Sequence, residues 1–132
     1  MAKTLDANQT TNCSLVNSLD AIKALADANR LELTLLIADQ GELCVCELVT
    51  AVQQPQAKIS RNLALLRRAE ILVDRRQGKW VHYQLNHTAP AWLMQMLDTL
   101  KAAEACHLNE LVQRLEQMGD RPQRLSNCCP ST

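Results

Sequence analysis

Apolar side chains recur at helical spacing along most of the chain, which predicts a mainly helical fold. An apolar residue occupies every third or fourth position from Leu15 to Leu25, and this marks a first helix over about residues 14–26. Asp27 is the expected N-cap of a second helix, and Gly41 suits the left-handed position that ends it. Three further helices are expected over about residues 44–52, 56–69 and 90–118.

The pattern changes to alternation after the fourth helix, which predicts a pair of antiparallel strands. The first begins at Ile71, Gln77 and Gly78 turn the chain, and the second runs from Trp80 to Leu85. The expected fold class is therefore mainly α with a small β component (α+β minor). The expected architecture is a winged helix-turn-helix with a two-stranded β-wing. The N- and C-terminal helices carry apolar stripes that one domain does not need, so they are the expected dimerisation helices.

Composition fits one helical domain, because the 132 residues include only three Gly and no Phe. We expect a flexible arm over residues 1–13, a DNA-binding and dimerisation domain over 14–118, and a flexible, cysteine-containing tail over 119–132. No apolar run can span a bilayer and no signal-peptide pattern is present, so a cytoplasmic location without a membrane partner is expected. The six cysteines should then be reduced.

The net charge is zero, but the basic residues are concentrated in one segment. Residues 54–85 contain seven Lys and Arg against two Asp and Glu, a net charge of +5, whereas residues 1–53 have a net charge of −4. A localised patch of this kind can bind phosphate on a molecule that is neutral overall. Charge alone fits a solvated basic face equally well.

The basic segment covers the second helix of the helix-turn-helix and the wing, so double-stranded DNA is the expected partner. Gln and Asn can read adenine edges and Arg can read guanine, while basic wing residues would contact phosphate or the minor groove. A two-fold dimer would place two such helices about one DNA turn apart on a palindromic operator. The candidate contacts are Gln56, Lys58, Ser60, Arg61 and Asn62 in the helix, and Arg75, Arg76 and Lys79 in the wing.

Cys44 and Cys46 lie just before this helix-turn-helix. Two thiols this close in a reducing compartment are more often metal-binding or redox-active than structural. Near the start of a helix, unpaired N–H groups and the helix dipole favour the thiolate. On a regular helix the two side chains would point about 200° apart, so a shared ligand would have to distort the first turn. We expect that distortion to shift the recognition helix.

Three segments, Glu42–Leu48, Lys58–Arg67 and Gln77–Tyr83, resemble the ArsR/SmtB family, especially its arsenic-responsive repressors with a Cys-Val-Cys site. The likeness spans roughly residues 18–117. It implies a homodimeric winged-helix repressor, not an enzyme, that binds its operator as the apoprotein. It also implies release of DNA when trivalent arsenic or antimony, As(III) or Sb(III), binds the thiolates of Cys44 and Cys46, with no organic cofactor.

The resemblance leaves the third ligand open. Many relatives have a cysteine three residues after the pair, where this chain has Val49. Cadmium- and lead-sensing relatives use a cysteine in the N-terminal arm, a part that Cys13 could take, and the tail pair Cys128 and Cys129 could also supply a sulfur. Cys106, in the last helix, is expected to be a packing residue or an incidental surface thiol.

Other positions also differ from the family pattern. Asp98 is not followed by His residues at the spacing of the family's zinc site, so that site is absent. Asn62 stands where His is common, and Glu70 replaces the usual Gly after the recognition helix. Glu70 must therefore adopt a positive φ, or the helix ends differently. His82 and His87 are expected to be surface residues rather than ligands.

Several other functions compete with this interpretation. The same fold could sense cadmium, lead or zinc, or cysteine oxidation. A thiol-dependent reductase or transferase is disfavoured, because the sequence lacks a Cys-x-x-Cys beside a βαβ unit, a nucleotide-binding glycine loop and an evident Cys–His pair. An architectural DNA-binding protein with inert cysteines would bind DNA whatever happens to its thiols.

Overall fold

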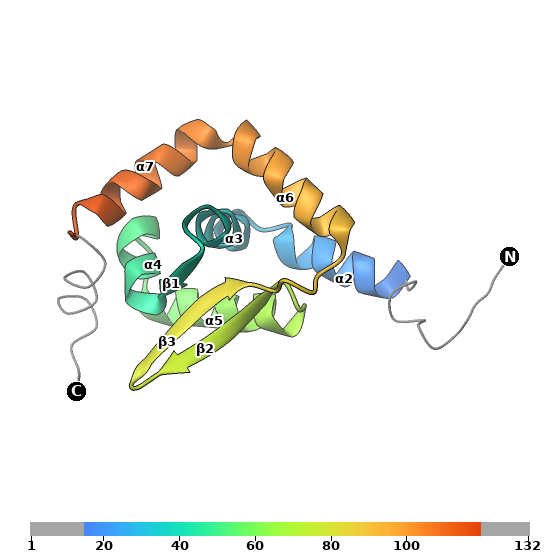
Figure 1. Ribbon diagram of the computed structural model, residues 1–132, viewed down its shortest axis with the longest axis horizontal. Helices are drawn as coiled ribbons and strands as arrows, with labels where there is room; N and C mark the ends of the chain where they lie inside the picture. Colours follow the sequence, from blue (N-terminus) through green and yellow to red (C-terminus); the bar gives the residue numbers. More distant parts are fainter. Residues whose placement is uncertain (1–14, 120–132) are drawn as a thin grey trace, which may run out of the picture.

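The computed structural model describes residues 15–119. The elements are, in chain order, α2 (Leu15–Leu25), α3 (Ala28–Gln40), β1 (Glu42–Cys44), α4 (Val45–Val52), α5 (Gln56–Arg68), β2 (Leu72–Gln77), β3 (Trp80–Leu85), α6 (Ala91–Ala103) and α7 (Ala105–Glu116). Helices α6 and α7 arch over α3, while α5 and the β2–β3 hairpin form the opposite side of the molecule (Figure 1). Helix α4, a short turn and α5 make the helix-turn-helix, and the hairpin makes the wing.

Helix α3 begins and ends where the sequence predicts. The backbone of Asp27 is extended, and its carboxylate accepts a hydrogen bond from the backbone N–H of Arg30 at 3.0 Å. This hydrogen bond lowers the pKa of the Asp27 carboxyl. At the other end Gly41 has a φ of +92°, and its N–H donates to the carbonyl of Ile37 at 2.7 Å.

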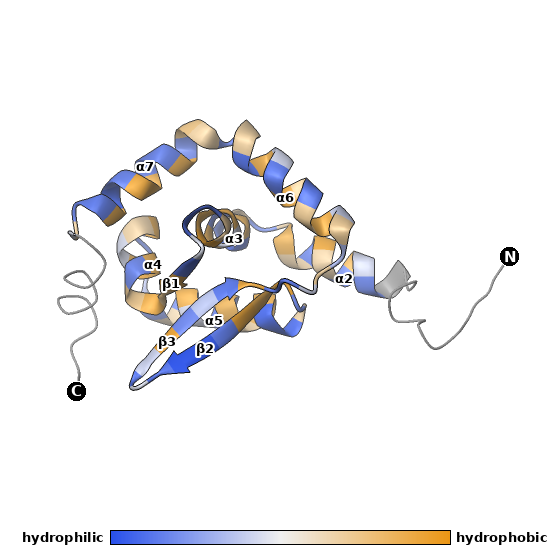
Figure 2. Cartoon of the chain, in the orientation of Figure 1, coloured by the Kyte–Doolittle hydropathy of each residue, from blue (hydrophilic) through white to orange (hydrophobic). Residues whose placement is uncertain are grey.

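Helix α3 lies at the centre of the core and packs against α2, α4, α5, α6 and α7 as well as β1 and β3. The apolar faces of the surrounding helices turn toward it (Figure 2). Predicted inward positions of α5 are confirmed, since Ile59, Leu63 and Leu66 are fully buried. Each such side chain contributes about 1.5–3 kcal/mol relative to an exposed one. Other fully buried core residues are Leu33, Leu36, Ile37, Leu43, Leu48, Ile71, Leu72, Leu97 and Leu111.

The sheet has three strands, so the prediction of a two-stranded wing was incomplete. Strand β1 pairs with β3 in the antiparallel order β1-β3-β2, and this places Cys44 directly opposite His82. The hairpin pairs Gln77 with Trp80, and Gly78 takes a φ of +64° in its two-residue turn. Strand β1 is only three residues long. That is too short for an alternating pattern to reveal it in the sequence.

The expected single helix over residues 90–118 is wrong, because it breaks into α6 and α7. The break is at Glu104, whose φ of −105° and ψ of 24° leave the helical region. Leu97 and Leu111, on either side of the break, are both buried, so the apolar pattern runs through it unchanged. Over residues 15–119, none of the helices is both long and apolar enough to cross a bilayer.

Candidate nucleic-acid interface and cysteine site

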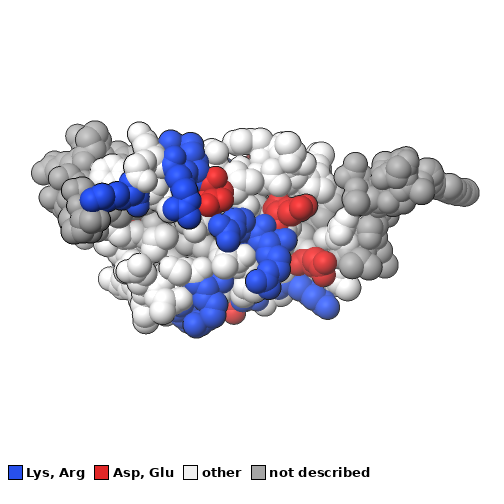
Figure 3. All heavy atoms as spheres, turned by 90° about the horizontal axis from the view of Figure 1, so that it is seen from below, with Lys and Arg blue, Asp and Glu red and all other residues white. Residues whose placement is uncertain are grey.

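The recognition helix and the wing share one face of the molecule. Seen from below in Figure 3, this face carries a band of Lys and Arg side chains with a few acidic residues between them. The basic segment that the sequence identified contributes Lys58, Arg61, Arg67, Arg68, Arg75, Arg76 and Lys79, which all belong to α5 and the wing. Tertiary structure therefore gathers the local charge excess on a single surface that could follow a phosphate backbone.

Three of the predicted contacts on α5 are exposed, namely Gln56, Ser60 and Arg61. Lys58 is half-buried, and its ammonium group donates to Oε1 of Gln54 at 3.3 Å in the turn before the helix. These four residues therefore remain candidates for contact with DNA.

The expected DNA contact at Asn62 is wrong, because this side chain does not reach the surface. Its side chain is 6% exposed, and its Nδ2 donates to Oδ1 of Asn29 on α3 at 2.7 Å. Its Oδ1 accepts a longer hydrogen bond of 3.4 Å from Arg30. Its polar side chain beside the apolar stripe of α5 predicts an outward-facing position, but a buried amide is stable where its hydrogen-bond partners are also buried.

The predicted basic residues of the wing are all exposed, but one is engaged within the molecule. The Arg75 guanidinium donates to both carboxylate oxygens of Glu42, at 2.7 and 2.8 Å. This hydrogen-bonded pair raises the pKa of Arg75 above its usual value. Because Glu42 lies in β1 and Arg75 in β2, the pair bridges the central strand β3. The strand that leads into the cysteines is thereby joined to the wing.

Cys44 and Cys46 occupy different kinds of position, although α4 begins within one residue of the expected start at about Cys44. Cys44 is the last residue of β1 and the N-cap of α4, with an extended backbone at φ −94° and ψ 168°, and it is 2% exposed. Cys46 is half-buried in the first turn of α4 and is held in a disulfide, whereas Cys44 is a free thiol. The expectation that all six cysteines are reduced is therefore wrong for Cys46 in this structure. The expected placement of both side chains on one regular helix is therefore wrong, because Cys44 precedes the first helical residue. The pair spans the junction between a strand and a helix.

A buried carboxylate supports this junction. Glu47 is fully buried, and its Oε1 accepts a hydrogen bond from the backbone N–H of Cys44 at 2.9 Å. Glu47 lies three residues after the N-cap, which is the spacing of a capping box. Sequence reasoning missed its role, although that spacing could have shown it.

The remaining titratable candidates are spread over the molecule. His82 is 1% exposed, so the expected surface position is wrong for it, whereas His87 is exposed as expected. Cys106 is an exposed thiol on α7. Cys13, Cys128 and Cys129 lie outside the described residues. Within residues 15–119, no group of three His, Cys, Asp or Glu side chains is arranged to hold a metal ion.

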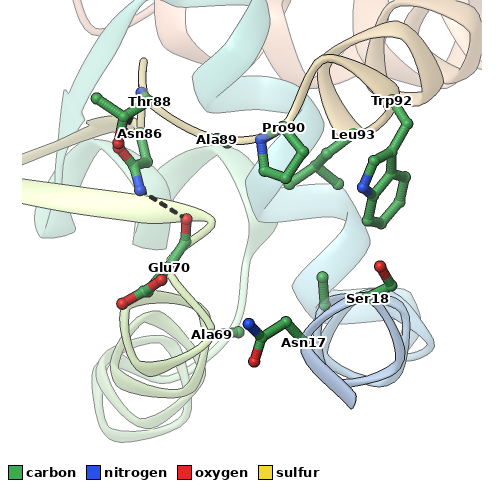
Figure 4. Close-up of a pocket in the computed structure, with 11 residues that line it drawn as sticks. Asn17, Ser18, Ala69, Glu70, Asn86, Thr88, Ala89, Pro90, Trp92 and Leu93 are labelled. Atoms are coloured by element: carbon green, nitrogen blue, oxygen red, sulfur yellow. Dashed lines mark hydrogen bonds between the residues drawn. The ribbon is translucent and has the colours of Figure 1, made fainter. Parts of the chain in front are cut away.

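An exposed apolar face lies away from these sites. Leu19 and Ile22 on α2 and Trp92 on α6 are 45%, 47% and 36% exposed. A cleft of about 590 Å³ opens beside Trp92, between α2, the end of α5 and the start of α6. Figure 4 shows Trp92 at its rim and the hydrogen bond from Asn86 to the carbonyl oxygen of Glu70. The residues that line this cleft include none of the cysteines or candidate DNA contacts.

Comparison with known proteins agrees with this geometry. Residues 27–73 match the family described as bacterial regulatory protein, arsR family. The chain is 47% identical over 115 residues to an arsenic resistance transcriptional regulator of Pseudomonas putida, covering 87% of this chain and 100% of that protein. It is 46% identical over 102 residues to an arsenical resistance operon repressor of Escherichia coli, covering 77% and 87% of the two chains.

A solved structure shows the same fold. It is a homodimeric winged helix-turn-helix DNA-binding domain from Mycobacterium bovis, with a TM-score of 0.60 and 22% sequence identity, covering 88% of this chain and 96% of that one. The predicted winged helix-turn-helix is therefore confirmed. Members of the matched arsR family, including the two relatives named above, are transcriptional regulators and not enzymes. The chain belongs to the ArsR family of bacterial regulatory proteins and is a winged-helix transcriptional repressor.

Proposed function

We propose that this repressor is a homodimer that binds a palindromic operator as the apoprotein and releases it when As(III) or Sb(III) binds Cys44 and Cys46. The observation that supports this best is the position of the two cysteines, of which Cys46 must first be reduced to offer a thiolate. They lie at the junction of β1 and α4: Cys46 is in the first helix of the helix-turn-helix, and Cys44 pairs with His82 of the wing strand β3. Soft trivalent metalloids prefer thiolate ligands over oxygen or nitrogen. The relatives described above are named for resistance to arsenic.

The coupling we propose runs through the N-cap. Bringing both sulfurs onto one ion requires Cys44 to leave its extended position or the first turn of α4 to bend. Either change disturbs the hydrogen bond between the Cys44 N–H and Glu47. Helix α4 packs on α5, and β1 is tied to the wing through Glu42 and Arg75, so the disturbance reaches both DNA-binding elements. The ligand then favours a shape that DNA disfavours.

A third thiolate would come from Cys13, Cys128 or Cys129. A structure with bound arsenite, in which residues 43–48 keep their apo conformation, would contradict the coupling but not the ligands. The DNA-binding residues that we propose are Gln56, Lys58, Ser60 and Arg61 on α5, with Arg75, Arg76 and Lys79 in the wing.

The test is release of DNA by the inducer. Binding of the reduced protein to a duplex from the region upstream of its own gene is followed by fluorescence anisotropy while arsenite, antimonite, cadmium, lead or zinc is added. We expect release by arsenite and antimonite, and none from the Cys44→Ser/Cys46→Ser variant. Cys106→Ser is the matched control, because it removes an exposed thiol far along the chain. Release by cadmium or lead alone would make the protein a different sensor, and binding unaffected by every ion would remove the sensing function.

A further inference from the structure

A buried polar bridge joins the recognition helix to the start of α3. Asn62 on α5 donates from Nδ2 to Oδ1 of Asn29 at 2.7 Å, and its own Oδ1 accepts from Nη1 of Arg30 at 3.4 Å. A guanidinium has donors only, so Arg30 must face the oxygen of the Asn62 amide. The amide nitrogen then has to point at Asn29. The three side chains therefore fix each other's orientation.

The bridge also reaches helix α2. Nε of Arg30 donates to the backbone carbonyl of Ala24, in the last turn of α2, at 2.6 Å. Asn29 and Asn62 are 8% and 6% exposed, so water cannot easily replace a lost partner. The recognition helix, the central helix and the proposed dimerisation helix are thus connected by directed hydrogen bonds inside an otherwise apolar contact.

We propose that Asn62 is a positioning residue for operator binding, acting through Asn29 and Arg30, and that it does not touch DNA. Apolar contacts between α3 and α5 hold the helices together but are not directional. Hydrogen bonds are directional, so the bridge sets the angle and register of α5 relative to α2. In a dimer that joins two copies through α2, this angle fixes the separation of the two reading helices. The inference rests on the proposed binding to an operator.

Two isosteric variants test whether operator binding needs the hydrogen bond from Asn62 to Asn29, or only an amide side chain at each position. Asn29→Asp keeps the acceptor that Asn62 needs, and its charge lies in the first turn of α3, where the helix dipole favours an anion. Asn62→Asp removes the donor and, with Asn29 in its observed orientation, sets a carboxylate oxygen against the amide oxygen of Asn29. We expect Asn62→Asp to weaken binding to the upstream duplex at least about tenfold, and Asn29→Asp to stay within about threefold of the wild type. Far-UV circular dichroism establishes that both variants are folded.

A second measurement distinguishes positioning from contact. Affinities are measured for duplexes that each carry one base-pair change, with the wild type, Asn62→Ala, Asn29→Ala and the double variant. A positioning role predicts that Asn62→Ala reduces discrimination at all base pairs together, and that the two alanine effects are not additive. Loss confined to one base pair would show a direct contact and overturn the inference. Equal losses for the two Asp variants would also overturn it, and a wild-type protein that binds no duplex would overturn the proposed function as well.

Discussion

Glu70 follows the recognition helix, and the sequence leaves two alternatives there: a positive φ at Glu70, or a helix that ends differently. The structure has the first, strained alternative, with a φ of +63°. The N–H of Glu70 donates to Arg67 and the N–H of Ile71 to Leu66, at 2.9 and 3.0 Å, which is a Schellman end to α5. A side chain at this position costs about 1 kcal/mol relative to glycine. Glu70→Gly should therefore raise the free energy of unfolding by about 0.5–1 kcal/mol in urea titrations.

The matched control is Ala69→Gly, one residue earlier at a φ of −79°. At this negative φ alanine is not strained, so glycine relieves no strain in the folded state. Glycine also loses more conformational entropy on folding, so this variant should be less stable than the wild type. If Glu70→Gly proved no more stable than the wild type, strain at the end of the recognition helix would be disproved.

Asp27 gives a prediction of pH dependence at the same scale. Its folded pKa is lowered below 3.8 by the hydrogen bond from the Arg30 N–H, so the cap contributes stability above that pH and loses it as pH falls through the folded pKa. Asp27→Ala should cost about 1 kcal/mol at neutral pH. The difference from the wild type should shrink in urea titrations carried out progressively below pH 3.8. Asp27→Ser keeps a neutral cap, so the loss of stability that protonation of Asp27 causes in the wild type below pH 3.8 should be absent from this variant.

At the scale of elements, β1 is the connection between the cysteines and the wing. Glu42 holds Arg75 by two hydrogen bonds, and both side chains are partly exposed, so the pair contributes little to stability. Glu42→Gln should weaken this hold and leave Arg75 available to phosphate. We expect tighter binding to the upstream duplex and a smaller change in affinity on adding arsenite, both measured by anisotropy.

Asp74→Asn is the matched control for this element. It removes the ion pair between Arg67 and Asp74, which is 3.4 Å long and does not involve β1. The arsenite effect should then equal that of the wild type. An unchanged arsenite effect in Glu42→Gln would exclude the pair of Glu42 and Arg75 as a route from β1 to the wing.

At the scale of the whole molecule, the exposed apolar face on α2 and α6 implies a partner. Leu19, Ile22 and Trp92 have little reason to be exposed on a monomer, and a second copy is the partner we propose. Leu19→Glu should shift the protein toward monomer in sedimentation velocity and weaken operator binding by at least about tenfold. Gln40→Glu, an exposed change at the end of α3, should leave both unchanged. A Leu19→Glu protein with an unaltered sedimentation coefficient would place the dimer surface elsewhere.

Much of the candidate site could be predicted because its information is local. The cysteine pair, the basic segment and the inward stripe of Ile59, Leu63 and Leu66 follow from spacing and charge along the chain. Asn62 and His82 could not be placed in this way. Each is polar and belongs to a half-exposed element, and whether it is buried depends on what neighbouring elements bring against it.

The sequence by itself determined the winged-helix class and the cap at Asp27, and it narrowed the end of α5 at Glu70 to two alternatives, since each depends on residues within a few positions of one another. Only the tertiary structure decided that Cys44 ends a strand, that Glu42 holds Arg75, and that Asn62 turns inward to Asn29. The last two join residues 33 positions apart, and all three depend on how strands and helices pack. Hydrophobic periodicity reports which face of one element is apolar, but not which polar groups on two elements meet.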